Sequence, residues 1–139
     1  MDLVEVQAQM TFALRRRELG WRVPSETRIP GDDADHLALL DGHVVAAVVS
    51  HAPWPYPDEP ETSARYFFGM AVNGRYQRQG HGRRLLAAVA DRARAAGQPL
   101  LWAEARESAI GFYASCGARC TAAFINEAGL TVRRVVFRL

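Results

Sequence analysis

A strand-like run, a glycine-containing loop and an amphipathic helix follow one another between Arg65 and Gly97, and this succession constrains the fold most strongly. The run Arg-Tyr-Phe-Phe-Gly-Met-Ala-Val is aromatic and β-branched, as strands are. Gly69 inside it predicts a bulge or a close approach of another group to the backbone. After the loop, apolar residues recur with the helical period: Leu85, Leu86, Val89, Ala90 and Ala93.

The remaining segments predict a mixed α/β protein. The dipeptide Asp41-Gly42 between two apolar runs is the strongest short hairpin signal, and runs that are apolar on both faces indicate a covered sheet. Further elements are expected as a strand near Leu3, helices at about 10–19 and 108–116, and strands at about 99–103, 118–125 and 130–139. We therefore expect a hairpin first, one strand–helix–strand crossover, and antiparallel strands at the end.

Length and composition indicate one globular domain. The chain has 139 residues, 49% hydrophobic and 23% charged, so we expect a single domain over 1–139. The longest apolar run, Val44 to Val49, falls far short of the ~20 residues that span a bilayer. The first residues lack a basic start and an apolar core. A cytoplasmic protein with no membrane partner is expected.

The charge and cysteine content exclude several classes of function. Seventeen basic residues, all arginine, against fifteen acidic ones give +2, too little to indicate a nucleic-acid partner. Cys116 and Cys120 are too few for a disulfide framework or a four-ligand zinc site, and no metal is expected. The acidic cluster Asp32, Asp33 and Asp35 beside His36 suits a metal or a cationic amine, but a solvated loop is the commoner explanation.

The loop at 77–84 carries the chemistry. Its glycines let backbone N–H groups point at an anion, and the following helix N-terminus adds positive potential. Arg78, Arg83 and Arg84 add charge at the same place. The kinase phosphate loop requires a lysine, which the chain lacks, and the dinucleotide fingerprint requires glycine where Leu85 stands. With these two motifs excluded, the sequence indicates an anion-binding loop of another kind.

The pattern Gln77-x-x-Gly80-x-Gly82 resembles the pyrophosphate loop of the GNAT superfamily of N-acetyltransferases. Gly69-Met70-Ala71-Val72 resembles the end of the family's fourth strand, and 109–117 resembles its A-x-x-F-Y-x-x-x-G segment. The run Pro30-Gly31-Asp32-Asp33 is similar to a P-G-D-D-like run that is often found in the subgroup that this chain most resembles. The motifs cover about 66–117, and the order of elements fits most of the chain.

The resemblance implies an acyl-CoA N-acyltransferase fold. Its central sheet would be mixed and mostly antiparallel, with about six or seven strands, helices on both faces and a bulged fourth strand. Acetyl-CoA would be the co-substrate, an amine the acceptor, and direct attack in a ternary complex the mechanism. The implied cofactor-binding residues are Met70, Ala71, Val72, Gln77, Arg78, Gln79, Gly80, His81, Gly82, Arg83 and Arg84.

The resemblance also suggests two residues for the reaction. Tyr113 would act as the general acid that protonates the departing CoA thiolate. Glu104 stands where an asparagine of an N-A-R run is often found in the resembled subgroup, and here the run is Glu104-Ala105-Arg106. Glu104 acts as a base, contacts the acceptor or pairs with Arg106, and the sequence leaves these roles open.

For most of the other arginine, histidine and aromatic residues, the sequence predicts a structural position and no catalytic role. Arg15, Arg16 and Arg17 are expected on a solvated helix face, His36 and His43 at the surface or a sheet edge, and Phe112 in the core. His81 is expected to face solvent or the CoA phosphates, and His51 is a weak candidate for the acceptor site. The apolar final strand suits a homodimer interface or an internal position. A catalytically weak acyl-CoA-binding module is the alternative function, and the acceptor is not identified.

Overall fold

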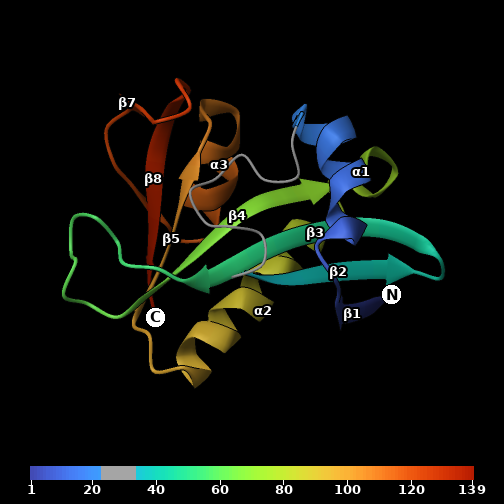
Figure 1. Cartoon of the computed structure of the whole chain (residues 1–139), viewed down its shortest axis with the longest axis horizontal. Coiled ribbons are helices and arrows are strands. Elements are labelled where there is room, and N and C mark those ends of the chain that lie inside the picture. The colour runs from blue at the N-terminus through green and yellow to red at the C-terminus, as the bar shows by residue number, and fades with distance from the viewer. Residues whose placement is uncertain (23–33) are drawn as a thin grey trace. The chain divides into compact units, whose positions relative to one another are not determined.

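The computed structural model describes residues 1–22 and 34–139, so the Pro30-Gly31-Asp32-Asp33 run lies outside the described residues. It is a mixed α/β structure with an eight-stranded, mostly antiparallel sheet (Figure 1). The predicted fold class is confirmed, with eight strands in place of six or seven. The chain divides into a first unit, 1–52 and 67–89, and a second unit, 53–66 and 90–139.

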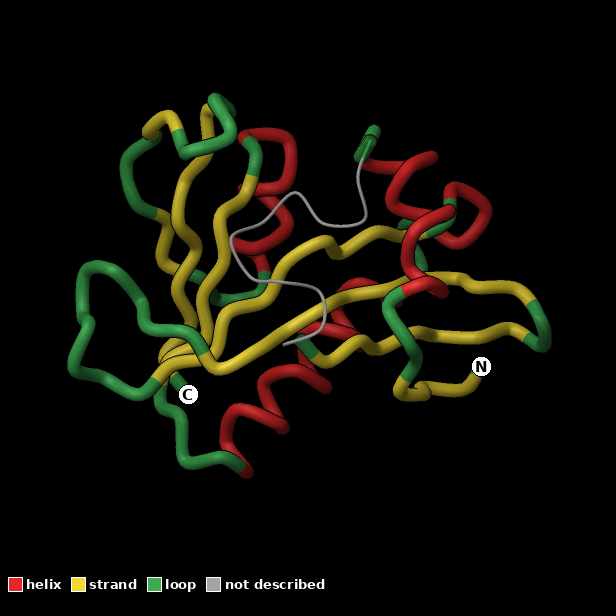
Figure 2. The backbone as a smooth tube through the Cα atoms, in the orientation of Figure 1, coloured by secondary structure: helices red, strands yellow, loops and turns green. Residues whose placement is uncertain are grey.

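The first unit contains the predicted hairpin. β2 (Asp35–Asp41) and β3 (Val44–Pro53) pair antiparallel, and the chain reverses between Asp41 and Val44 (Figure 2). β1 (Asp2–Glu5) adds to the other edge of β2. Gly42 has φ +59°, the left-handed conformation that two-residue hairpin turns require.

Helix α1 (Gln9–Leu19) packs an apolar side chain onto this hairpin. Leu14 lies in a buried cluster with Ala38, Val48 and Ala71. Gly20, in the left-handed conformation with φ +70°, ends the helix as predicted, and its N–H donates to the carbonyl of Arg16.

Arg15 corrects the expectation of a solvated arginine face on α1. Its side chain is 2% exposed, whereas Arg16 and Arg17 are exposed. The guanidinium donates to the carbonyl of Gly69 (2.7 Å), to Thr11 (3.0 Å) and to Ser50 (2.6 Å), and it lies over the Trp21 and Phe68 rings. Burial lowers its pKa to about 10, so it remains a cation at neutral pH.

The last residues of β4 (Ala64–Val72) lead from the first unit's core to the predicted loop. A short 3-10 turn, η2 (Gly74–Tyr76), follows, and then α2 (His81–Ala95). The apolar stripe predicted for this helix is confirmed, since all five of its residues are buried. Gly97 has φ +71° and follows the helix end.

The second unit is built around β8 (Thr131–Arg138). β5 (Leu100–Ala105) pairs antiparallel with one edge of β8 and parallel with the first residues of β4. The other edge of β8 pairs with β6 (Arg119–Cys120) and β7 (Phe124–Ile125). β8 is therefore an internal strand, which is one of the two alternatives left open for it.

The single strand predicted at 118–125 is wrong, because the structure has two short strands there. Thr121 lies between them: its N–H donates to the carbonyl of Arg134, and its hydroxyl accepts from the N–H of the same residue. The Thr121 hydroxyl thus replaces a backbone carbonyl as the acceptor for the Arg134 N–H of β8, and the regular ladder of backbone hydrogen bonds is interrupted.

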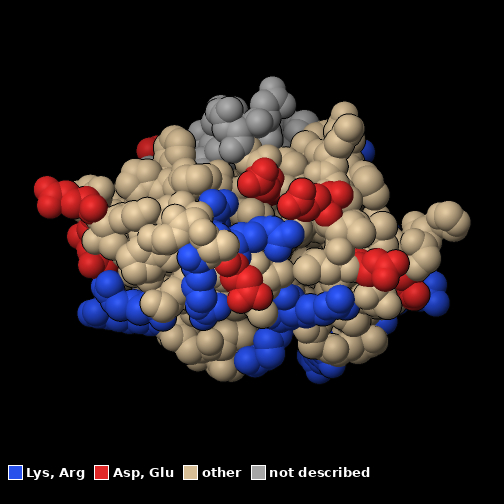
Figure 3. Space-filling view, turned by 90° about the horizontal axis from the view of Figure 1, so that it is seen from below, with Lys and Arg blue, Asp and Glu red and all other residues tan. Residues whose placement is uncertain are grey.

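The surface mixes charges of both signs. The face seen in Figure 3 carries arginine side chains with aspartate and glutamate side chains between them, in keeping with a net charge of +2. Among the described helices, none has the length and apolar character needed to cross a bilayer.

Candidate functional site

The loop that joins β4 to α2 has an unusual backbone. Arg78 has φ +61° and Gly80 has φ +85°, so two residues of this loop adopt left-handed conformations. For Arg78 this conformation is strained by roughly 1–2 kcal/mol, whereas for glycine it is not. Such a backbone turns successive N–H groups toward one side, and α2 begins at the next residue, His81. The site of a Cβ at Gly80 is open space.

The arginines predicted to bind phosphate lie at this loop and on the first turn of α2. Arg78, Arg83 and Arg84 are all exposed. Nη1 of Arg84 donates to the carbonyl oxygen of Met1 across 3.0 Å, so part of this guanidinium is held by the chain's own N-terminus. Exposed guanidinium groups beside a helix N-terminus favour an anion with several oxygens.

Three of the other predicted cofactor contacts, Gln79, His81 and Gly82, complete the loop. Nε2 of Gln79 donates to the carbonyl of Arg75 across 3.2 Å. His81 is half-buried, with its ring edge-on to Tyr76 and the ring centres 6.0 Å apart. The Tyr76 hydroxyl donates to Asp41 across 2.6 Å, and this contact links the loop to the β2–β3 turn.

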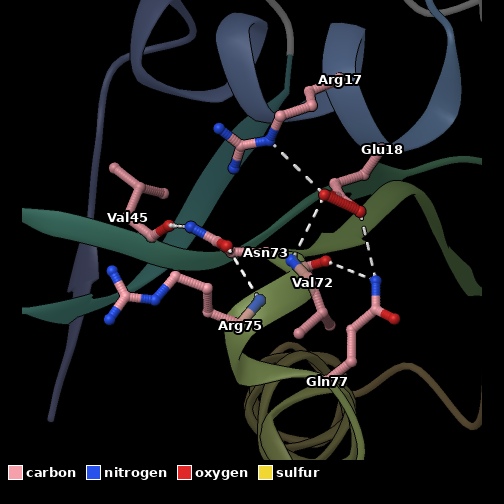
Figure 4. A network of polar contacts seen from close by, with 8 residues as sticks. Arg17, Glu18, Val45, Val72, Asn73, Arg75 and Gln77 are labelled. Atoms are coloured by element: carbon pink, nitrogen blue, oxygen red, sulfur yellow. Dashed lines mark hydrogen bonds and ion pairs between the residues drawn. The ribbon is translucent and has the colours of Figure 1, made fainter.

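Gln77, the first residue of the motif, has protein partners for its side-chain amide. Nε2 donates to the carbonyl of Val72 across 3.0 Å and to Oε2 of Glu18 across 3.2 Å (Figure 4). Its direct contact with a cofactor stays a prediction. In this structure the amide holds the loop to the end of β4 and to α1.

Two residues in this network were missed by the sequence analysis. Glu18 accepts hydrogen bonds from Gln77 and from the N–H of Gly74. The side chain of Asn73 accepts from the N–H of Arg75 and donates to the carbonyl of Val45. The preference of asparagine for capping positions was a usable signal for Asn73. No local pattern distinguishes Glu18, because its partners lie 56 and 59 residues away.

The three strand residues predicted to contact pantetheine lie directly after Gly69. Ala71 is buried, and Met70 and Val72 are half-buried. A Cβ on Gly69 would lie 2.5 Å from Nε of Arg15, so the predicted close approach to this backbone is confirmed. The structure brings Met70–Val72 and the loop together in the first unit.

Tyr113 and Glu104 both belong to the second unit. Tyr113 lies in α3 (Glu107–Ser115) and is 8% exposed, whereas Phe112, expected in the core, is 37% exposed. The helix turns Tyr113 inward, and its neighbour therefore faces outward. Burial raises the pKa of Tyr113, with a smaller contribution from Cys116, so the phenol is protonated at neutral pH.

Glu104 is half-buried near the end of β5. Its Oε1 lies 3.4 Å from Nδ2 of Asn126, a residue of the turn between β7 and β8. Oδ1 of Asn126 accepts from the N–H groups of Ala128 and Leu130, each across 3.0 Å, so this side chain holds the turn between β7 and β8.

The three histidines other than His81 lie in the β2–β3 hairpin. His36, expected at the surface or a sheet edge, is buried in β2, which pairs with both β1 and β3, and its Nδ1 lies 2.6 Å from the Ser50 hydroxyl. His43 is exposed as expected. His51 is buried in β3. Within 1–22 and 34–139, no three His, Cys, Asp or Glu side chains gather as metal ligands do.

Comparison with known families decides the assignment. Residues 4–118 match the family model described as "Acetyltransferase (GNAT) family". The chain belongs to the GNAT family. A search of curated protein sequences returned no match.

Solved structures with this GNAT fold cover almost the whole chain. An IAA acetyltransferase from Bacillus cereus is 17% identical, with 99% of each chain covered and a TM-score of 0.74. A GNAT acetyltransferase from Elizabethkingia anophelis, with acetyl-CoA bound, is 16% identical (TM-score 0.73), and a Bacillus subtilis acetyltransferase in complex with CoA is 15% identical (TM-score 0.73). In both of these cases 99% of this chain and 97% of the other are covered. At these identities the likeness shows the fold of this GNAT protein.

Proposed function

We propose that this GNAT protein is a cytoplasmic, single-domain N-acetyltransferase that uses acetyl-CoA and acetylates an amine of a small molecule or a protein. The observation that carries the proposal is the left-handed backbone at Arg78 and Gly80 directly before α2. This backbone, the helix N-terminus and the exposed arginines fit a pyrophosphate. The family supports acyl transfer, and two structural neighbours hold CoA or acetyl-CoA.

In the proposed reaction one bond forms, one bond breaks and one proton moves from the amine to the sulfur. The neutral acceptor amine attacks the thioester carbonyl carbon, the C–N bond forms, and the C–S bond breaks. The amine loses one proton and the sulfur gains one, so the products are an acetamide and CoA. We assign the backbone of Met70–Val72 to pairing with the pantetheine arm as an added strand does. An N–H of Ala71 or Val72 would polarise the thioester carbonyl.

Tyr113 is proposed as the proton donor to the departing sulfur. An ordinary phenol is already a weaker acid than a free thiol, whose pKa is about 8.5, and the raised pKa of Tyr113 widens this difference. Its contribution is therefore greatest as a hydrogen bond to the sulfur while the C–S bond breaks. Glu104 is proposed as a base or an acceptor contact, with Asn126 beside its carboxylate.

Thermal unfolding in the presence of acetyl-CoA, CoA, ATP and NADH tests the cofactor. A ligand at 100 times its Kd stabilises a fold by about 2.7 kcal/mol, a shift of a few degrees for a domain of this size. A shift with the CoA species alone is expected, and an amine screen with thiol detection then tests the transfer. A shift with ATP or NADH and none with CoA would overturn the proposal. Binding of CoA without turnover on any amine would favour the alternative, an acyl-CoA-binding module.

A further inference from the structure

The carboxylate of Glu18, near the end of α1, holds two points of the segment that leads from β4 into the loop. Oε1 accepts from the backbone N–H of Gly74 across 3.2 Å, and Oε2 accepts from Nε2 of Gln77 across 3.2 Å (Figure 4). We call Glu18, Gly74 and Gln77 the Glu18 clamp. It joins a helix near the N-terminus to residues more than fifty positions further along the chain.

Gln77 extends the clamp to the end of β4. A side-chain amide has two N–H donors, and here Nε2 donates to both Glu18 and the Val72 carbonyl. The segment from Val72 to Gln77 is thereby closed on itself and tied to α1. Asn73 holds the same segment from the other side, since its N–H donates to the Ala46 carbonyl across 2.8 Å.

The residue directly after the clamp is Arg78, which has a left-handed backbone. A strained conformation at a non-glycine residue persists only where its surroundings enforce it. Fixing the side chain of Gln77 by two hydrogen bonds fixes the residue from which the strained loop starts. Without the clamp, the loop would have to be ordered again each time a ligand binds, and this ordering weakens binding.

Removal of the Glu18 carboxylate has opposite expected effects on pyrophosphate affinity, depending on whether its charge or its hydrogen bonds dominate. A carboxylate near an anion-binding loop repels the anion, so on charge alone its removal should tighten binding of a pyrophosphate. Removal of a clamp should weaken that binding. The two effects are opposite in direction for the same substitution.

We propose that Glu18 is a positioning residue that holds the 77–84 loop in the conformation that binds the CoA pyrophosphate. This inference rests on the proposed CoA-binding function. It concerns the phosphate part of the ligand alone. Loss of the clamp should therefore affect ligands that carry the pyrophosphate and spare those that lack it.

The experiment compares Glu18→Ala with the wild-type protein and with Arg16→Ala, a substitution at an exposed residue of the same helix, as the control. Arg17 is unsuitable as the control, because its Nε lies 3.5 Å from Oε1 of Glu18, the oxygen that also accepts from the N–H of Gly74. Calorimetry measures Kd for CoA, and chemical-shift titration measures Kd for pantetheine, which has no pyrophosphate. Backbone hydrogen exchange at 74–80 without ligand gives a readout that needs no binding.

For Glu18→Ala we expect Kd for CoA to rise about tenfold, equivalent to about 1.4 kcal/mol, with Kd for pantetheine unchanged. Exchange at 74–80 should become faster, and Arg16→Ala should match wild type in all three measurements. Tighter or equal CoA binding in Glu18→Ala would overturn the inference while leaving the proposed function standing. An equal loss for CoA and pantetheine would also overturn it. A wild-type protein that binds no CoA would overturn the proposed function, and the inference with it.

Discussion

Nε of Arg15 donates a 2.7 Å hydrogen bond to the carbonyl oxygen of Gly69 in the first unit. The guanidinium lies where a side chain at position 69 would stand, and Gly69 adopts φ +62°. One buried cation thus links α1 to β4, and through Ser50 it also contacts β3. The residues after Gly69 are those assigned to the pantetheine arm, so this pair fixes the start of the proposed cofactor strand.

Substitution of Gly69 by alanine should destabilise the fold strongly. The new Cβ would meet the Arg15 guanidinium at 2.5–2.7 Å, and the left-handed backbone would add about 1–2 kcal/mol of strain. Gly97→Ala is the matched control, because Gly97 has φ +71° and, its chain neighbours apart, no atom of the described residues lies within 4 Å of the added Cβ. Urea unfolding should show a loss for Gly69→Ala that exceeds the loss for Gly97→Ala by about 1–3 kcal/mol. Equal losses would show that Arg15 moves aside freely.

Arg15→Met should lower the free energy of unfolding by about 3 kcal/mol. Methionine fills much of the volume but leaves the Gly69 carbonyl and the Ser50 hydroxyl without their buried donor. Arg16→Met, one position along the same helix and exposed, should change stability by less than about 0.5 kcal/mol. Chemical denaturation of both variants measures the difference, and a stable Arg15→Met variant would contradict the role assigned to this network.

Gly80→Val should weaken CoA binding more than any loss of stability explains. A β-branched residue resists the φ of +85° found at Gly80, so the loop N–H groups would be turned away from the ligand. Gly42→Val introduces similar backbone strain in the β2–β3 turn, where φ is +59°. Both variants should lose a similar amount of thermal stability, but only Gly80→Val should raise Kd for CoA, by about tenfold or more. Equal affinities would remove the loop from the binding site.

Tyr113→Phe should reduce turnover about a hundredfold while leaving Kd for CoA unchanged, because only the hydroxyl proposed to assist the leaving sulfur is lost. Phe112→Leu, a substitution at the adjacent exposed aromatic residue, serves as the control and should retain full turnover. Steady-state rates with thiol detection provide the measurement. A Tyr113→Phe enzyme with normal turnover would exclude Tyr113 from the mechanism.

Tyr113 should also make stability fall at high pH. Its pKa in the folded protein is raised above the unfolded value of about 10, so the folded state retains a proton that the unfolded state loses. This contribution is fully present below pH 10 and is lost as pH rises from there toward the folded pKa. Between about pH 9.5 and 11, wild type should therefore lose more unfolding free energy than Tyr113→Phe. Parallel curves for the two proteins would contradict the raised pKa.

Local chemistry determined much of this protein from the sequence alone. The Asp41-Gly42 turn, the helix end at Gly20 and the buried stripe of α2 each depend on neighbours within a few residues. Gly80 is of the same kind, because the freedom to adopt a left-handed φ is a property of glycine itself. These signals predicted the fold class and the candidate cofactor loop.

Tertiary structure alone decided which of the longer polar side chains are buried and which partners they bond. Arg15 is buried and Arg16 exposed because only one of them faces Ser50 and Gly69, which lie 35 and 54 residues away. Glu18 holds the loop through partners 56 and 59 residues away, and the inward turn of α3 buries Tyr113 in place of Phe112. Such contacts depend on which faces of separate elements meet, and no short sequence pattern encodes that meeting.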